Sequence, residues 1–306
     1  MTVNSARQQG DAQGQGDEDR LRRPSRQRSL QLGELRLTYI PDGEVGLLAR
    51  GWLPDSTEQD WGDTFSAYVN EAGYLTAGIG GLLVEHGERA LLIDVGYGPK
   101  SDPAIPDFPV GPTHGGALLD NLARAGRTPE EIEAVAFTHL HTDHIGWAWH
   151  PAPGSDRPAF TRAEYLVAQA EWAGRDQLHG HGTSPEILAV LAPKVRTVAD
   201  GEEIFPGVRV RPSAGHTPGH VAYEITSGGR RVIVLGDALH TPVQIARPDW
   251  PSAPDVDRAQ SARARRELVS ALLEPGTIGF GVHFADVVFG EVRDHGDGPA
   301  WHPIEG

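Results

Sequence analysis

The sequence has no cysteine among its 306 residues. This absence excludes disulfide bonds, thiolate metal sites and a cysteine nucleophile. Positive charge is also scarce, because 27 lysines and arginines face 42 aspartates and glutamates, which leaves a formal net charge of −15. An acidic chain repels phosphate backbones and lacks the basic surface that nucleic-acid binding needs. We therefore expect no nucleic-acid partner.

Long hydrophobic runs are missing as well. No apolar segment reaches the length of a membrane span, and the first residues contain no hydrophobic segment of a secretory signal. We expect a cytoplasmic protein with no membrane partner. Residues 1–29 are rich in Gln, Gly, Asp and Arg and are predicted to be a disordered, dispensable tail. Residues 30–306 are then one globular domain.

Apolar periodicity predicts strands that alternate with helices along this domain. A half-buried strand is expected near residues 35–39, and a hairpin is expected around Gly87. Residues 41–75 have weak periodicity and are predicted to be irregular. A helix ending before Gly126, a buried strand at 132–137, short β segments over 195–240, a helix over 255–274 and a β segment over 277–292 follow. This alternation without a repeat predicts an α/β sandwich.

A dense histidine cluster follows the buried strand. The stretch FTHLHTDHIGW at residues 137–147 contains His139, His141, Asp143 and His144. Alternate residues of a strand share one face, so His139 and His141 can point together while the next turn adds Asp143 and His144. Imidazole nitrogens and carboxylate oxygens are zinc ligands when thiolates are absent. Four such groups suit two metals in a shared site better than one catalytic metal with an open position.

Three further candidate ligands also stand where an apolar strand ends. They are His216 in SAGHTPGH, Asp237 in VIVLGDALH and His283 in IGFGVHFAD. Their common position lets all three converge on one edge of the sandwich. Burying Asp237 is costly unless positive charge compensates it, and a metal ion supplies such charge. For His283, a satisfied core histidine is the alternative.

This set of motifs, in this order, resembles the metallo-β-lactamase superfamily over about residues 35–300. The forms GHTPGH and GDALH are similar to the branch that holds acyl-homoserine lactonases and methyl-parathion-type hydrolases. The resemblance implies an αββα sandwich of two mixed β-sheets flanked by helices. It also implies one metal on His139, His141 and His216, a second on Asp143, His144 and His283, and Asp237 as a bridge between them.

The implied activity is that of a hydrolase with two zinc ions per chain. Two divalent ions about 3.5–4 Å apart can hold a bridging water and lower its pKa. The resulting hydroxide would attack a small ester, lactone, lactam or phosphotriester. The candidate catalytic residues are Asp143, which can steer the hydroxide or carry a proton, Asp237 and His240. An iron-dependent dioxygenase or redox enzyme on the same fold is the alternative, although di-iron relatives carry an acidic residue in place of His141.

Residues near the motifs have expected roles of their own. The lactonases carry a tyrosine at the third position after the bridging aspartate, where this chain has His240, so His240 is either a substrate contact or a plain loop histidine. Asp94 is expected to orient a ligand histidine, and His220 is expected to be structural. His179 and His181 are expected in an exposed loop.

Aromatic residues close to the cluster are candidates for a pocket wall that would suit a small hydrophobic ligand. They are Trp61, Phe65, Phe108, Trp147 and Trp149. For at least half of them we favour ordinary core packing instead. The expected partner is a small-molecule substrate, and a homodimer is left open.

Overall fold

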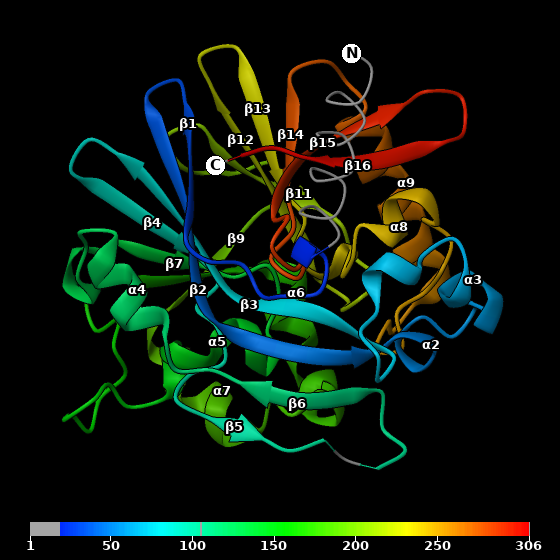
Figure 1. Ribbon diagram of the computed structural model, residues 1–306. Helices are drawn as coiled ribbons and strands as arrows, with labels where there is room; N and C mark the ends of the chain where they lie inside the picture. Colours follow the sequence, from blue (N-terminus) through cyan, green and yellow to red (C-terminus); the bar gives the residue numbers. More distant parts are fainter. Residues whose placement is uncertain (1–18, 105, 306) are drawn as a thin grey trace, which may run out of the picture.

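The computed structural model describes residues 19–104 and 106–305. Two β-sheets pack face to face, and helices cover the outer face of each (Figure 1). Both sheets are mixed, because parallel pairs such as β4–β7 (Arg89–Ile93 and Ala134–Ala136) and β13–β14 (Arg230–Val234 and Thr277–Phe280) occur beside antiparallel ones. The predicted αββα sandwich is confirmed.

The first sheet has nine strands in the described residues, and β1 pairs with β2 beside the main path. Along the main path the order is β5-β6-β2-β3-β4-β7-β8-β9. The bounds not yet given are β1 Arg28–Leu32, β2 Leu35–Leu48, β3 Tyr74–His86, β5 Ser101–Asp102, β6 Val110–His114, β8 Glu164–Ala168 and β9 Val195–Val198.

The second sheet has seven strands in the part of the chain that the structure describes, in the order β10-β11-β12-β13-β14-β15-β16. Its strands therefore follow the sequence, and only the β13–β14 pair is parallel. The remaining bounds are β10 Glu203–Phe205, β11 Val208–Pro212, β12 Val221–Ser227, β15 Phe289–Asp294 and β16 Pro299–Pro303.

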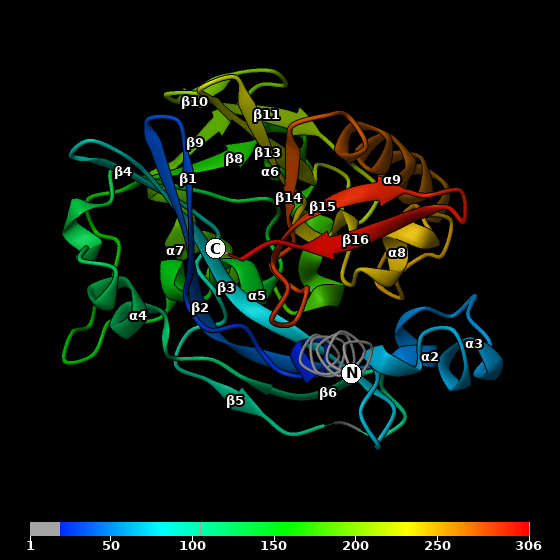
Figure 2. The ribbon, with the colours of Figure 1, turned by 45° about the horizontal axis from the view of Figure 1, so that its top comes forward.

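Helices lie mainly on the outer faces, as the second view also shows (Figure 2). Apolar side chains of α4, α5 and α7 pack on the first sheet, and those of α8 and α9 pack on the second. The α-helices are α2 Ala49–Trp52, α3 Glu58–Gly62, α4 Leu118–Arg124, α5 Thr142–Trp149, α6 Gln169–Gly174, α7 Pro185–Leu191, α8 Val243–Ala246 and α9 Arg258–Leu272. Short 3-10 helices are η1 Ser66–Tyr68, η2 Pro129–Glu131, η3 Arg175–His181, η4 Ala192–Lys194 and η5 Gly236–Ala238.

The main core lies between the sheets. Leu37, Tyr39 and Leu82 of the first sheet meet Tyr223 and Phe280 of the second, and all are at most 1% exposed. Alternation along β2 and β3 places one set of side chains in this core and the other set toward the outer helices. The hairpin predicted around Gly87 is confirmed, with His86 opposite Arg89 and Gly87 at a φ of 60°.

Two expectations about chain organisation were wrong in part. Residues 41–75 are not uniformly irregular, because β2 continues to Leu48 through a bulge between Pro41 and Gly43. The bulge turns the Asp42 carboxylate inward, where it accepts hydrogen bonds from Tyr97 N and Leu118 N at 2.7 and 2.9 Å. The β segment expected over 277–292 is split into β14 and β15 by a loop that carries His283.

The expected boundary of the tail at residue 29 also shifts. Residues 1–18 lie outside the described residues, but arginines among residues 19–29 pair with Asp286 in the loop between β14 and β15, and Arg28 begins β1 of the first sheet. The polar composition that suggested disorder is explained by a buried carboxylate, Asp286, with which several of these arginines pair. Within the described residues, no helix combines the length and apolarity needed to cross a bilayer.

Candidate metal centre

The predicted ligands are brought together at one end of the sandwich, where several strands give way to loops. His139 and His141 follow β7, while Asp143 and His144 lie in the first turn of α5. His216 lies in the β11–β12 connection, Asp237 in η5 after β13, and His283 in the loop after β14. The convergence expected from strand ends is therefore present.

The first group comprises His139, His141, His216 and Asp237, and all four are buried. Their candidate ligand atoms lie within 4.8 Å of one another. Nε2 of His216 is 3.0 Å from Nδ1 of His141 and 3.4 Å from Oδ2 of Asp237. Nε2 of His139 is 3.7 Å from the same oxygen. Oδ2 of Asp237 thus faces the first group.

The second group comprises Asp143, His144 and His283, whose candidate ligand atoms also lie within 4.8 Å of one another. Nε2 of His144 and Nε2 of His283 each lie 3.0 Å from Oδ1 of Asp237. Their distances to Oδ2 of Asp143 are 3.7 and 3.8 Å. Asp237 therefore presents one oxygen to each group, which is the geometry of a shared ligand.

Buried polar atoms without hydrogen-bond partners show, independently of the motifs, that these donors suit metal ions. Nε2 of His139, Nε2 of His144 and Oδ1 of Asp237 are buried atoms that make no hydrogen bond of acceptable geometry with any described residue. Such atoms are rare in folded proteins because their desolvation goes uncompensated. Neutral imidazoles and a carboxylate that converge in this way are suitable ligands for zinc and similar divalent ions.

Outer partners hold the ligand histidines in orientation. Asp94 does so as predicted, since its Oδ2 lies 2.9 Å from Nδ1 of His144 and its Oδ1 accepts the Thr138 N–H at 2.9 Å. Asp255 plays the equivalent part for His216, with 3.2 Å between Oδ1 and Nδ1. Nδ1 of His283 donates to the Gly78 carbonyl at 2.7 Å.

Two buried groups tie the ligand loops together. The Glu171 carboxylate accepts hydrogen bonds from Leu140 N at 3.0 Å and from Thr217 Oγ1 at 2.7 Å, so it joins the loop of His139 to that of His216. His220 is structural as predicted, because its Nε2 accepts the Asp237 N–H at 2.9 Å. The roles of Asp255 and Glu171 were not predicted, because neither residue belongs to a histidine motif.

Electrostatics in the cluster follow from burial and from Asp237. Burial, with the nearby charge of His144, holds the pKa of His139 well below its ordinary value. Burial also opposes charge on His144, but the carboxylates of Asp237 and Asp143 outweigh it and hold the pKa of His144 well above its ordinary value. Burial lowers the pKa of His220 to about 3, so His220 is neutral.

His240 is not a plain loop histidine. It is 2% exposed, its Nε2 lies 3.0 Å from Oδ2 of Asp237, and its ring stacks on His283 with 5.5 Å between centroids. The Asp237 carboxylate can only accept from Nε2, so Nδ1 is left to accept from the Ser252 hydroxyl at 2.9 Å, while Ser252 Oγ accepts from Gln244 Nε2 at 3.1 Å. This network assigns the ring proton of His240 to Nε2.

A cavity of about 580 Å³ opens onto these ligands. One wall is apolar and includes Val45, Leu47 and Ile79 from β2 and β3. His141, Asp143, His216, Asp237, His240 and His283 line the polar part. Lys100 is the cationic side chain of the lining, and it pairs with Asp102 at 2.7 Å.

Core packing, which we favour for at least half of the five aromatic candidates, is confirmed for four of them. Of the five candidates, Phe108 lines the cavity. Trp61 and Phe65 are buried in the core cluster that also contains the apolar wall of the cavity, and Trp147 is buried on the outer face of the first sheet. Trp149 packs partly buried in the same outer cluster. Trp52 and Tyr97 line the cavity instead, and Trp52 contacts the His240 ring edge-on at 5.0 Å. His179 and His181 fall in η3, where the structure does not describe their side chains.

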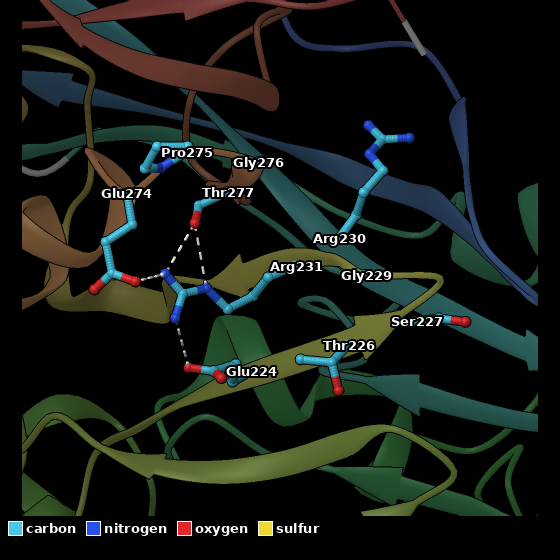
Figure 3. Close-up of a pocket in the computed structure, with 10 residues that line it drawn as sticks. All are labelled: Glu224, Thr226, Ser227, Gly229, Arg230, Arg231, Glu274, Pro275, Gly276 and Thr277. Atoms are coloured by element: carbon cyan, nitrogen blue, oxygen red, sulfur yellow. Dashed lines mark hydrogen bonds and ion pairs between the residues drawn. The ribbon is translucent and has the colours of Figure 1, made fainter.

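A second depression, of about 480 Å³, lies beside β12, β13 and the start of β14 (Figure 3). Its charges are paired with one another: the Arg231 guanidinium donates to Thr277 Oγ1 at 2.8 Å and to Glu274 at 2.9 Å, and it lies 3.7 Å from Glu224. Arg230 points away from this network. A depression whose charges already satisfy one another offers no ligand atoms comparable to those of the histidine cluster.

Known proteins share both the sequence pattern and the fold. The model of the metallo-beta-lactamase superfamily matches residues 82–281. An N-acyl homoserine lactonase of Bacillus sp. is 29% identical over 128 residues, which are 40% of this chain and 45% of the relative. A probable metallo-hydrolase of Mycobacterium tuberculosis is 26% identical over 181 residues, which are 52% of this chain and 56% of the relative. The chain thus spans about half the length of these curated relatives.

Solved structures show the same architecture over more of the chain. AidC, a dizinc quorum-quenching lactonase in complex with the product N-hexanoyl-L-homoserine, superposes with a TM-score of 0.77 at 22% identity, covering 92% of this chain and 98% of AidC. AbOPH, a hydrolase in the β-lactamase superfamily, gives a TM-score of 0.77 at 24% identity, covering 93% and 99%. At these identities the likeness shows the fold alone. From the matched family model, the sandwich and the His/Asp cluster, the chain belongs to the metallo-β-lactamase superfamily.

Proposed function

We propose that this chain is a dinuclear zinc hydrolase that cleaves a small, neutral ester or lactone bearing an apolar group. The observation that carries the proposal is the buried cluster in which Asp237 turns one carboxylate oxygen toward each of two ligand groups. Zinc is favoured over iron because the donors are mostly imidazoles and the position of His141 is not acidic. The curated and structural likeness to lactonases supports the same class.

The substrate class follows from the cavity. Its apolar wall suits a hydrocarbon substituent, and its volume suits a small molecule. Carboxylates of Asp143 and Asp237 line the polar end, while Lys100 is already paired with Asp102. Apart from the zinc ions, the described lining offers no unpaired cation to the part of the substrate that lies away from the metals, so a substrate whose substituents are neutral is favoured.

Residues at the polar end of the cavity have different roles in the proposed reaction. Metal ions held there lower the pKa of a coordinated water and polarise a carbonyl or phosphoryl oxygen. Asp143, whose side chain is 26% exposed toward the cavity, can accept a proton and pass it to the leaving oxygen. His240 lines the cavity, and its Nε2–H, which lies 3.0 Å from Oδ2 of Asp237, can share its hydrogen bond with a substrate oxygen.

The test is a substrate panel assayed with zinc-loaded protein and with the Asp237→Asn variant. The panel contains lactones, aryl esters, β-lactams and phosphotriesters. We expect zinc-dependent hydrolysis of a lactone or ester that Asp237→Asn abolishes. Hydrolysis confined to β-lactams or phosphotriesters would overturn the substrate class, and iron-dependent oxidation without hydrolysis would overturn the hydrolase itself.

A further inference from the structure

Residues 20–28, here called the N-terminal arm, lie against the loop of residues 281–288 that carries His283. The arm forms hydrogen bonds with the backbone of this loop at Asp286. Asp286 N donates to the Arg20 carbonyl at 3.0 Å, and the Arg20 guanidinium donates to the Asp286 carbonyl at 2.8 and 3.1 Å. A segment far away in the sequence thus supplies both backbone partners of a residue three positions from a predicted metal ligand.

The arm also satisfies the carboxylate of Asp286, whose side chain is 3% exposed. Arg23 donates to Oδ2 at 2.8 and 3.0 Å, Arg28 donates to Oδ1 at 2.5 and 2.9 Å, and Ser25 Oγ lies 3.1 Å from Oδ1. A buried carboxylate is costly without such partners. Without the arm, Asp286 would have to move toward water and take the loop with it.

The loop itself needs this support. Ala285, between His283 and Asp286, has a φ of 43°, in the left-handed region that non-glycine residues avoid. Such a conformation persists where surrounding contacts enforce it. Leu21 of the arm lines a small void together with His283 and Ala285, so the arm reaches the ligand residue itself.

We infer that the N-terminal arm positions His283 for the second group of the metal centre, with Asp286 as the link. Arg20, Arg23 and Arg28 are then positioning residues. The first group, which draws on His139, His141 and His216, does not involve this loop. This inference rests on the proposed dinuclear site, and it predicts that loss of the arm weakens one metal and spares the other.

The test is a titration of metal-free protein with Zn²⁺ against a chromophoric chelator. In Arg28→Gln we expect the dissociation constant of the second zinc to rise about 10–100-fold, the range for loss of an outer partner of a metal ligand. The first zinc should bind as in wild type. Arg28→Lys, which keeps the charge but loses the planar fork, should recover part of the affinity.

Arg26→Gln is the matched control, because the Arg26 side chain is exposed and forms no hydrogen bond or ion pair with other described residues. If Arg28→Gln does not fold, Arg23→Gln replaces it, since the Arg23 side chain is 56% exposed. Wild-type affinity for both zincs in these variants would overturn the role of the arm alone. A wild-type protein that binds fewer than two zincs would instead contradict the proposed function.

The coupling must also act in reverse, because linkage between two sites is reciprocal. Zinc binding should therefore slow trypsin cleavage after Arg26 and Arg28, measured by intact mass in wild-type protein. The protection should disappear in His283→Ala. It should persist in Arg26→Gln, in which trypsin can cleave after Arg28 but no longer after residue 26. Equal cleavage rates with and without Zn²⁺ would overturn the inference.

Discussion

The two groups of the metal centre are supported in different ways. His216 of the first group is held by Asp255, which pairs with Arg265 at 3.0 Å, and both side chains of that pair are 0% exposed. His283 of the second group depends on a loop whose carboxylate, Asp286, is paired with arginines from the N-terminal arm. One support belongs to the core, and the other joins two distant parts of the chain.

The contrast has an energetic consequence. A buried, hydrogen-bonded ion pair is costly to break because one charge is left behind, about 3–5 kcal/mol. Burial raises the pKa of Asp255, but His216 and Arg265 outweigh it and hold that pKa well below its ordinary range. The first group is therefore preorganised before metal binds, whereas the second also needs the arm in place. We expect the first metal to bind more tightly than the second.

The largest effect should come from the residue that the two groups share. Asp237→Asn removes the charge that lets two dications sit close together, so both metals should be lost or weakened. Turnover should fall at least about a hundredfold, the scale for loss of a key electrostatic group. Elemental analysis and kcat on the same preparation check this. Full metal content in Asp237→Asn would contradict the shared-ligand assignment.

Asp255→Asn removes the support of His216 in the first group. The variant keeps the shape but leaves Arg265 without its buried partner and His216 without its carboxylate. We expect the first zinc to bind about 10–100-fold more weakly and the second to change little, measured by the same chelator titration. A selective loss of the second zinc would reverse the assignment of the two groups.

Glu171→Gln weakens the link between the two loops that carry His139 and His216 of the first group. Burial raises the pKa of Glu171, although hydrogen bonds from Thr217, Leu140 and Gly219 oppose the rise. A glutamine cannot accept from all of these donors. The free energy of unfolding should fall by about 1–3 kcal/mol, as measured by denaturant unfolding of the metal-free protein. Because the pKa of Glu171 is raised in the folded state, protonated Glu171 contributes to the free energy of unfolding at low pH. This contribution is lost as the pH rises through the folded-state pKa.

The smallest effect concerns His240, which contacts both groups but is assigned to the substrate. His240→Ala should leave the zinc content at the wild-type level and change kcat/KM by about 2–10-fold per lost hydrogen bond, unequally across the substrate panel. His240→Tyr should shift preference toward lactones if the family pattern applies. Loss of zinc from His240→Ala would make His240 a ligand, which its place beside Asp237 and His283 also permits.

The convergence of the candidate ligands could be predicted from the sequence, but their support could not. His139, His141, Asp143 and His144 stand in one motif, and His216, Asp237 and His283 each follow an apolar strand, so local pattern indicates that they meet at one end of the sandwich. Asp255 and Glu171 act across long sequence separations and carry no local signal. Composition predicts a disordered tail for residues 1–29, because arginine-rich composition does not reveal that Asp286, the partner of the arm, is buried elsewhere in the chain. Proximity to a motif does not fix the direction of an aromatic side chain, so the sequence could not tell that Phe108 lines the cavity while the other four candidates pack in the core.

The metal content of the wild-type protein decides whether the chain holds a dinuclear zinc centre. Protein purified without chelator, supplied with Zn²⁺ and freed of excess metal, should contain about two zincs per chain by elemental analysis, and removal of zinc should abolish hydrolysis of the panel substrate. A ratio of one, with iron predominating, would contradict the dinuclear zinc hydrolase and favour the dioxygenase alternative.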